Sequence, residues 1–175
     1  EEMQRAYATK RNHFSFRHRC ADGSIRNVES FSGPIDIGDR QLLYSIVHDV
    51  TERHKAEAEL RKLSMAIEQS PESIMITNLE ARIEYVNEAF VKATGYQREE
   101  VIGQNPKILH SGQTPREEHA ALWAVLSKGQ TWKGEFINRR KDGSVYVEFA
   151  VISPVFDIDG KVTHYVAVKE DITEK

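Results

Sequence analysis

An internal repeat constrains this 175-residue chain more than any other feature of its sequence. Residues 16–24 begin with Phe and end in Asp-Gly-Ser, and residues 136–144 do the same 120 positions later. Residues 48–52 (His-Asp-Val-Thr-Glu) match residues 170–174 (Glu-Asp-Ile-Thr-Glu) at an offset of 122. We expect the two extra residues to fall in a turn, where insertions are tolerated. Such a repeat predicts two copies of one structural unit.

The two copies differ in length. The first holds three strand-like segments, at about 13–21, 24–36 and 40–49, and lacks the elements that precede the matching strands of the second copy. We therefore expect residues 1–50 to be the C-terminal half of a first domain. Residues 51–69 are expected to form a linker helix, and residues 70–175 a complete second domain.

The expected linker helix carries a heptad-like apolar seam. Its members are Ala56, Leu60, Leu63 and Ile67, at spacings of 4, 3 and 4 residues. Asp49 and Glu52 can form its capping start. The seam is short, so a coiled coil and a solvated linker helix both remain open.

The second copy predicts an α+β domain. Two short strands (73–77 and 82–86) come first, then a helix over 88–94 and a helical turn over 99–102. A longer helix follows, and three strands close the domain over 131–141, 144–156 and 161–171, with Asp-Gly turns between them. This order predicts a five-stranded antiparallel sheet with helices on one face.

The longer helix has a clear start in the sequence. Thr114 can cap it, Pro115 suits the first helical position and Glu117 can complete a capping box. Trp123 lies on its apolar face, beside the strand that carries Asn138. A tryptophan there is either plain core or the wall of a pocket for a flat ligand with a polar edge, and both interpretations remain open.

Three polar residues of the closing strands are expected to share one face. Side chains alternate along a strand, and the Asp-Gly turns set the register, so Asn138, Glu148 and Lys169 should all point toward the helices. Glu148 and Lys169 can pair with each other, or serve a ligand whose edge alternates donors and acceptors, or do both. The matching residues of the first copy are His18 and Val28, which predict no such site there.

Composition excludes several classes of function. The formal net charge is -3 with acids and bases interspersed, which disfavours nucleic acid as a partner. No apolar run is long enough to span a membrane. A single cysteine, Cys20, rules out an internal disulfide or a multi-cysteine metal site and fits the cytoplasm. The histidines His48, His54, His110 and His119 have no nucleophile partner at readable spacing, so we expect no enzyme. His54, on the linker helix, is expected to be a lone surface histidine.

Several short motifs resemble the PAS sensor family. They are Glu68-Gln69-Ser70-Pro71, Asn87-Glu88-Ala89-Phe90, Thr94-Gly95-Tyr96, Arg140-Lys141-Asp142-Gly143-Ser144 and Asp171-Ile172-Thr173. The resemblance covers residues 65–175, and residues 13–51 as the C-terminal half of another PAS domain. It implies the PAS fold, a five-stranded antiparallel sheet with helices on one face.

One subgroup is more similar still. Residues 105–115, Trp123, Trp132 and residues 138–143 resemble the FAD-binding PAS domains of the NifL and MmoS type. That resemblance implies FAD, with Trp123 packed on the isoalloxazine and Asn138 bonded to its polar edge; FMN or an empty pocket are the alternatives. The full expected cofactor-binding set is Asn105, Ser111, Trp123, Trp132, Asn138, Glu148 and Lys169. Pro106 stands where light-oxygen-voltage (LOV) domains carry their photoreactive cysteine, so adduct chemistry is not expected.

The resemblance also implies a function and partners. We expect a cytoplasmic sensor that reports redox state or oxygen to an effector domain of the same polypeptide, a diguanylate cyclase or a histidine kinase. The alternative is a ligand-free PAS pair that serves dimerisation and signal relay. A homodimer is expected through the linker helix and the first three strands, whose apolar face needs a cover. The candidates on that face are Ile25, Phe31, Ile35, Leu43 and Ile46.

Overall fold

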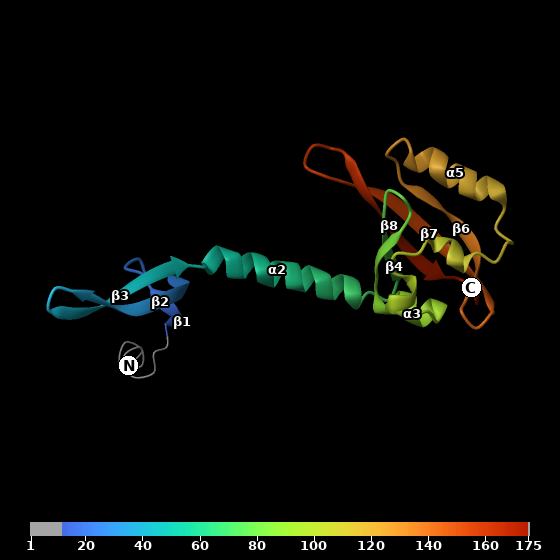
Figure 1. Cartoon of the computed structure of the whole chain (residues 1–175). Coiled ribbons are helices and arrows are strands. Elements are labelled where there is room, and N and C mark those ends of the chain that lie inside the picture. Colours follow the sequence, from blue (N-terminus) through green and yellow to red (C-terminus); the bar gives the residue numbers. More distant parts are fainter. Residues whose placement is uncertain (1–11, 175) are drawn as a thin grey trace. The chain divides into compact units, whose positions relative to one another are not determined.

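The computed structural model describes residues 12–174, which divide into two compact units between Leu63 and Ser64. Unit 1 precedes that division and unit 2 follows it. The strands and α-helices follow the pattern predicted from the sequence, with ends that agree within three residues, and a 3-10 helix over Pro106–Leu109 is an addition to it (Figure 1). Within the described part of the chain, no helix combines the length and hydropathy that a membrane crossing requires.

Unit 1 is built on a three-stranded antiparallel sheet in the order β1-β2-β3. Its strands are β1 (His13–Arg19), β2 (Ile25–Ile37) and β3 (Arg40–Asp49). The β1–β2 turn is fixed by Asp22, whose Oδ1 accepts the backbone N–H of Ser24 at 2.9 Å. Gly23 in that turn has a φ of 85°, which a residue with a Cβ rarely adopts.

Helix α2 (Thr51–Glu68) follows β3. Its start is capped by Asp49, whose Oδ1 accepts from the backbone N–H of Thr51 at 3.0 Å and from its hydroxyl at 2.6 Å. Glu52, expected to share this cap, instead pairs with Lys55 at 3.0 Å. Leu60 and Leu63 of the heptad-like seam are exposed, so within one chain the helix is a solvated one.

Unit 2 has the expected five-stranded antiparallel sheet, in the order β5-β4-β8-β7-β6. The strands are β4 (Ser73–Asn78), β5 (Ile83–Val86), β6 (Trp132–Arg139), β7 (Val145–Phe156) and β8 (Val162–Asp171). The helices are α3 (Glu88–Thr94), α4 (Arg98–Val101), the 3-10 helix η1 (Pro106–Leu109) and α5 (Arg116–Leu126). Helix α3 packs on β4 and α5 on β6 (Figure 1). The core between sheet and helices includes Phe90, Val101, Leu109, Leu126 and Phe136.

The strand registers reproduce the sequence repeat pair by pair. Phe16 lies opposite Val28 in unit 1, and their counterparts Phe136 and Glu148 lie opposite each other in unit 2. The pairs Gly33–Tyr44 and Ser153–Val166 also correspond, at offsets of 120 and 122. The two extra residues of the second copy therefore lie in the β7–β8 turn, which is where the sequence placed them.

Except for Val47, which lies on the other side, the exposed large apolar residues of the unit 1 sheet lie on one face. They are Ile25, Phe31, Ile35, Ile37, Leu42, Tyr44 and Ile46. Phe31 pairs with Ile46 and Ile35 with Leu42 across β2 and β3. Leu43 was expected on this face and is not there, because side chains alternate and its neighbours Leu42 and Tyr44 are. By the repeat, Phe31 corresponds to Val151, on the face of unit 2 opposite its cavity, so this is not the face that helices cover.

Candidate functional site

A cavity of about 620 Å³ lies in unit 2 between the inner face of the sheet and the elements that cover it. Its volume falls within the roughly 300–1,000 Å³ usual for small-molecule sites. The lining comes from β4 and the turn after it, η1, α5 and strands β6 to β8. Its polar members are Thr77, Glu80, Asn105, Lys107, His110, His119, Asn138, Tyr165 and Lys169, and its apolar walls include Met75, Leu122, Trp123, Leu126, Phe136 and Ile152.

Four of the seven expected residues line this cavity: Asn105, Trp123, Asn138 and Lys169. Ser111, Trp132 and Glu148 are not among the lining residues. The Ser111 hydroxyl donates a hydrogen bond to the backbone carbonyl of Ile137.

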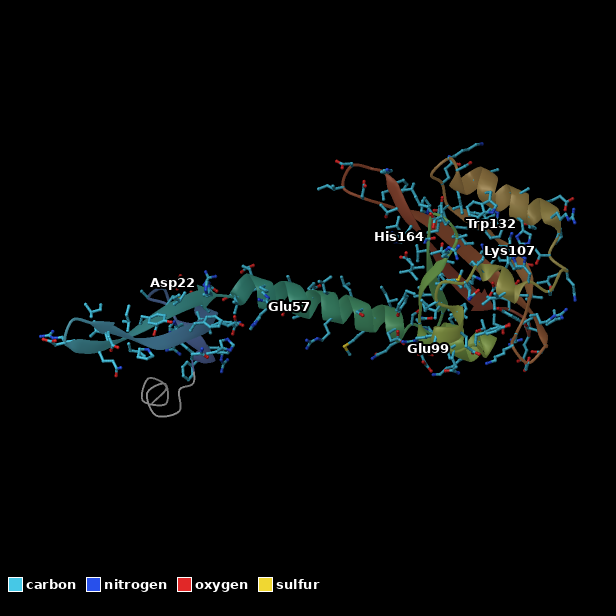
Figure 2. All side chains as sticks on the ribbon, viewed as in Figure 1. Asp22, Glu57, Glu99, Lys107, Trp132 and His164 are labelled. Carbon is cyan, nitrogen blue, oxygen red and sulfur yellow. The ribbon has the colours of Figure 1, made fainter. Side chains whose placement is uncertain are left out.

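Trp132 (labelled in Figure 2) is a core residue rather than part of the cavity wall. Its ring centroid is 5.0 Å from that of Phe136. A Cβ added at Gly134 would lie 2.2 Å from the indole, so the Trp132-Lys133-Gly134 sequence is a packing motif in which the glycine makes room for the ring.

The three polar strand residues meet as the sequence predicted. Asn138, Glu148 and Lys169 are 4%, 3% and 4% exposed. Glu148 Oε1 accepts from Lys169 Nζ at 2.7 Å and from Asn138 Nδ2 at 2.9 Å. A buried ion pair is tolerated when further hydrogen bonds satisfy it, and Asn138 supplies one. The pairing of Glu148 with Lys169 is thus realised, while Lys169 still lines the cavity.

Asn138 also has one polar atom left over. Among the described residues, its Oδ1 is buried without a hydrogen-bond partner. A buried acceptor left unsatisfied costs about 1–3 kcal/mol. Asn138 lines the cavity, so a ligand donor that reaches this atom removes that cost; the hydroxyl of Tyr146, opposite Asn138 on β7 and also buried without a partner in the described part of the chain, is the competing donor within the protein.

Trp123 is a cavity-wall residue and not plain core. Its side chain is 47% exposed, whereas Leu122 and Leu126 on the same helix are buried. The indole meets Tyr165 edge-on, with ring centroids 5.9 Å apart and planes at 85°. One aromatic face is therefore available beside the cavity for stacking against a flat ligand.

The loop before α5 is fastened to the edge of strand β6. Thr114 Oγ1 accepts from the backbone N–H of Ile137 at 2.9 Å, and His110 forms a β-bridge with Asn138. The prediction that Thr114 caps α5 is wrong, because its hydroxyl is used on the strand edge. The helix begins at Arg116, and Pro115 precedes it without a side-chain cap. Local spacing could not reveal this long-range bond.

Two histidines to which the sequence analysis gave no role, His110 and His119, contribute to the wall. The ring centroids of His110 and His119 are 4.6 Å apart, and His119 stacks on Phe136 at 5.5 Å. Partial burial lowers the pKa of His110, and the neighbouring His119, Lys107 and Lys169 lower it further. His119 lies four residues before Trp123, hence on the same face of α5, and this spacing could have located it.

The residues present fit a flavin. The cavity combines apolar walls, an open aromatic face at Trp123, a free acceptor on Asn138 and a fixed ammonium at Lys169. Those are the features that a flat ring system with alternating donors and acceptors on one edge requires. Across the described residues, no cluster of three or more His, Cys, Asp or Glu side chains could hold a metal ion.

Comparisons with known proteins give one family. Residues 71–174 match the family described as PAS domain. The chain is 40% identical over 107 residues to a nitrogen fixation regulatory protein of Klebsiella oxytoca, which covers 61% of this chain and 22% of that protein. The chain therefore spans about a fifth of the length of that relative.

Solved structures give the same fold. The LOV domain of a blue-light activated histidine kinase from Erythrobacter litoralis matches with a TM-score of 0.56 and 26% identity, over 60% of this chain and 99% of that one. A LOV domain studied with a flavin analogue matches with a TM-score of 0.58 and 26% identity, over 67% of this chain and 86% of that one.

Proposed function

This chain belongs to the PAS domain family, and on that premise we propose that unit 2 is a sensory domain that binds FAD and reports redox state or oxygen to an effector domain of the same polypeptide. The observation that carries the proposal is the unpartnered Oδ1 of Asn138 beside the fixed ammonium of Lys169 in a cavity of about 620 Å³. The resemblance to FAD-binding PAS domains and the likeness to a LOV domain studied with a flavin analogue point the same way.

We assign roles within the site on this basis. Asn138 accepts from the polar edge of the ring system, and Lys169 donates to it. Trp123 packs on the ring face, and Asn105, the residue that caps η1, contributes to the wall. Glu148 does not line the cavity itself. It positions Asn138 and Lys169 by accepting a hydrogen bond from each. Ser111 and Trp132 shape the wall through β6.

A bound flavin supplies a ring that accepts electrons and exchanges a proton, so the hydrogen bonding at its edge differs between oxidised and reduced forms. Asn138 lies opposite Tyr146 on β7 and two residues before Arg140. The Arg140 guanidinium is stacked on the Tyr146 ring at 4.3 Å, donates to the Ala93 carbonyl at 2.8 Å and pairs with Asp171. We propose that this chain of contacts carries a change at Asn138 to the end of β8 and onward to the effector.

The effector is proposed to be a histidine kinase or a diguanylate cyclase. 'Histidine kinase' occurs in the name of the Erythrobacter litoralis protein described above. The position of Asp171 at the end of β8 suits either proposed output, because an effector linked to this strand end would be reached from it.

The first test of FAD binding is the absorbance spectrum of purified protein, before and after incubation with FAD. We expect flavin bands that stay with the protein through gel filtration. Trp123→Phe should remain folded and bind flavin with a shifted spectrum or weaker affinity, because the smaller ring stacks over less area. The matched control is Phe149→Leu, an exposed aromatic on β7. Colourless protein that FAD does not reconstitute contradicts the proposal.

A second candidate is a ligand-free module for dimerisation and relay. The observation in its favour is the exposed apolar face of unit 1, where Phe31, Ile35, Leu42 and Ile46 are 40%, 44%, 45% and 53% exposed. We propose that a second copy covers this face, whether or not a flavin is bound. Light scattering at micromolar concentration should give a dimer that Ile35→Glu with Ile46→Glu converts to monomer. A wild-type monomer excludes the dimer and leaves the flavin proposal untouched.

A further inference from the structure

We propose that His110 and His119 are the proton acceptor of the cavity: one imidazole of the pair takes up a proton when the cavity gains a negative charge. This inference rests on the proposed flavin function, because the charge arrives either with an anionic ligand or with two electrons added to a bound flavin. It extends that function by coupling the state of the site to pH through residues of this chain.

The two rings converge from different elements onto the same wall. His110 follows η1, and its backbone bridges to Asn138. His119 is on α5 and is stacked on Phe136 of β6 with an angle of 22° between planes. Both line the cavity that Asn138 and Lys169 also line. A charge held by those two residues therefore lies in the same cavity as the imidazoles.

The ring nitrogens are available for proton exchange. Among residues 12–174, neither imidazole is engaged in a hydrogen bond or ion pair, and the ring contacts are those with each other and with Phe136. His110 packs one side of its ring against His119 but stays exposed to solvent, and His119 is half-buried, so protons reach the pair from solvent without an opening motion. An imidazole without a fixed partner changes its charge more readily than one held by a carboxylate.

The surrounding positive charges oppose a proton on His110 in the ligand-free protein. The charged lining residues are Lys107 on η1, Lys169 on β8 and Glu80 after β4; the lining positions on β6, β7 and α5 carry no carboxylate or ammonium. Glu148 does not line the cavity and forms an ion pair with Lys169. Two lysines and a second histidine oppose a proton on His110, consistent with its lowered pKa. A negative charge in the cavity offsets that opposition and raises the pKa.

The proton balance is simple. When an anion enters, one proton moves from solvent to an imidazole nitrogen, and it returns when the anion leaves. When a bound flavin is reduced by dithionite, the electrons come from dithionite, and the pair takes one proton from solvent in addition to those that the flavin takes itself. Reoxidation releases it.

The first experiment needs no ligand. The pKa values of His110 and His119 are measured by NMR titration of the histidine ring protons, with His110→Gln and His119→Gln providing the assignments. We expect the His110 pKa to lie below 6.5 and to rise in both His119→Gln and Lys107→Gln, since each removes a positive or potentially positive neighbour. His54→Gln on α2 is the matched control. An unchanged His110 pKa in both variants overturns the proposal.

The second experiment separates the two sources of charge. Calorimetry of riboflavin and FMN binding, in two buffers of different ionisation enthalpy, counts protons taken up; uptake with FMN but not with riboflavin assigns the charge to the phosphate. Reduction of the FAD-loaded protein at several pH values tests the other source. The midpoint potential should fall with pH more steeply in wild type than in His110→Gln with His119→Gln, by up to about 30 mV per pH unit for one proton in a two-electron couple.

These experiments can contradict the histidine proposal and the flavin proposal separately. Protein that binds no flavin contradicts the flavin proposal, and the ligand-free titration then decides the histidine pair on its own. Protein that binds flavin, but takes up the same number of protons on binding and on reduction with and without the two histidines, contradicts the pair and leaves the flavin proposal standing.

Discussion

The sheets of the two units pair their last three strands in the same register, yet only one of them faces a cavity with a buried charge. Unit 2 has Asn138, Glu148 and Lys169 where the repeat places His18, Val28 and Val47 in unit 1. Lys169 is 4% exposed and Val47 is 49% exposed. Strand pairing is therefore insensitive to these three positions. Register follows from alternation and turns, whereas the site follows from which side chains occupy one face.

The two units also share the way in which the last strand ends. In unit 1 the Thr51 hydroxyl accepts the N–H of Asn27 at 2.9 Å and donates to Asp49 at 2.6 Å. In unit 2 the Thr173 hydroxyl accepts the N–H of Val147 at 3.1 Å and donates to Asp171 at 2.5 Å. The shared Asp-x-Thr sequence is thus a structural device of the strand end, independent of any ligand.

The largest expected effect comes from making one position of unit 2 like unit 1. Lys169→Val leaves the Glu148 carboxylate buried without its cation, so we expect unit 2 to lose about 3–5 kcal/mol of unfolding free energy. Urea denaturation checks this. The double variant Glu148→Val with Lys169→Val should recover most of the loss, since an apolar pair of this kind is often neutral or stabilising. Equal losses in both would mean that the ion pair is not what distinguishes the two sheets.

A smaller effect is expected at Asn138. Asn138→Ala removes the second donor to Glu148, and we expect a loss of about 1–3 kcal/mol in unit 2 together with weaker flavin binding. The matched change in unit 1, His18→Ala, is at an exposed position and should stay within about 0.5 kcal/mol. Thermal unfolding of both variants makes the comparison. A similar cost at His18 would show that unit 1 uses that position structurally.

Substitutions at the two Asp-x-Thr strand ends should lower the free energy of unfolding by more similar amounts. Thr51→Val and Thr173→Val each remove a hydroxyl with two hydrogen bonds, for an expected cost of about 1 kcal/mol. Thr51 is 4% exposed and Thr173 is on the surface, so Thr51→Val should cost more. Denaturant midpoints of the two variants rank them. A larger effect at Thr173 contradicts this account.

The smallest expected effect is a pH dependence confined to unit 2. The pKa of His110 is lowered in the folded protein. The unfolded chain therefore binds more protons near its pKa of about 6.5, and folding stability should be complete above that pH and decrease as pH falls below it. Unfolding of wild type and His110→Gln between pH 5 and 8 tests the sign, with the variant showing the shallower dependence. Stability that rises toward low pH through this residue would reverse the assignment.

Sequence reasoning recovered what depends on local periodicity. The alternation along β6, β7 and β8, with turns at Asp-Gly, was enough to predict that Asn138, Glu148 and Lys169 lie on one face of the sheet. It failed where a side chain contacts a residue that is distant in the sequence. Thr114 looked like a helix cap because nothing local shows the free edge of β6, and the pairing of His110 with His119 needs the loop and the helix to be placed first.

In unit 1, the prediction of which residues share the exposed apolar face failed for a different reason. Leu43 was grouped with Phe31 and Ile35 by hydrophobicity, although the turn at Gly38 puts Leu42 opposite Ile35. Applying the alternation rule across that turn would have corrected it. The position of Trp132 in the core was likewise readable only after the close approach of Gly134 to its ring was known.

The bonds that fasten residues 110–114 to β6 have a consequence for aggregation. An uncovered edge strand offers its N–H and C=O groups to a strand of another molecule. On β6 both backbone groups of Ile137 are taken, by Ser111 and Thr114, and no incoming strand can add there without displacing that loop. Within the described chain, neither edge strand of unit 1, β1 or β3, has such a cover, although their counterparts are covered by the loop (β6) or paired with β4 (β8). Intermolecular strand addition, if the protein is concentrated or stored, should therefore begin at an edge of the unit 1 sheet, β1 or β3, rather than in unit 2.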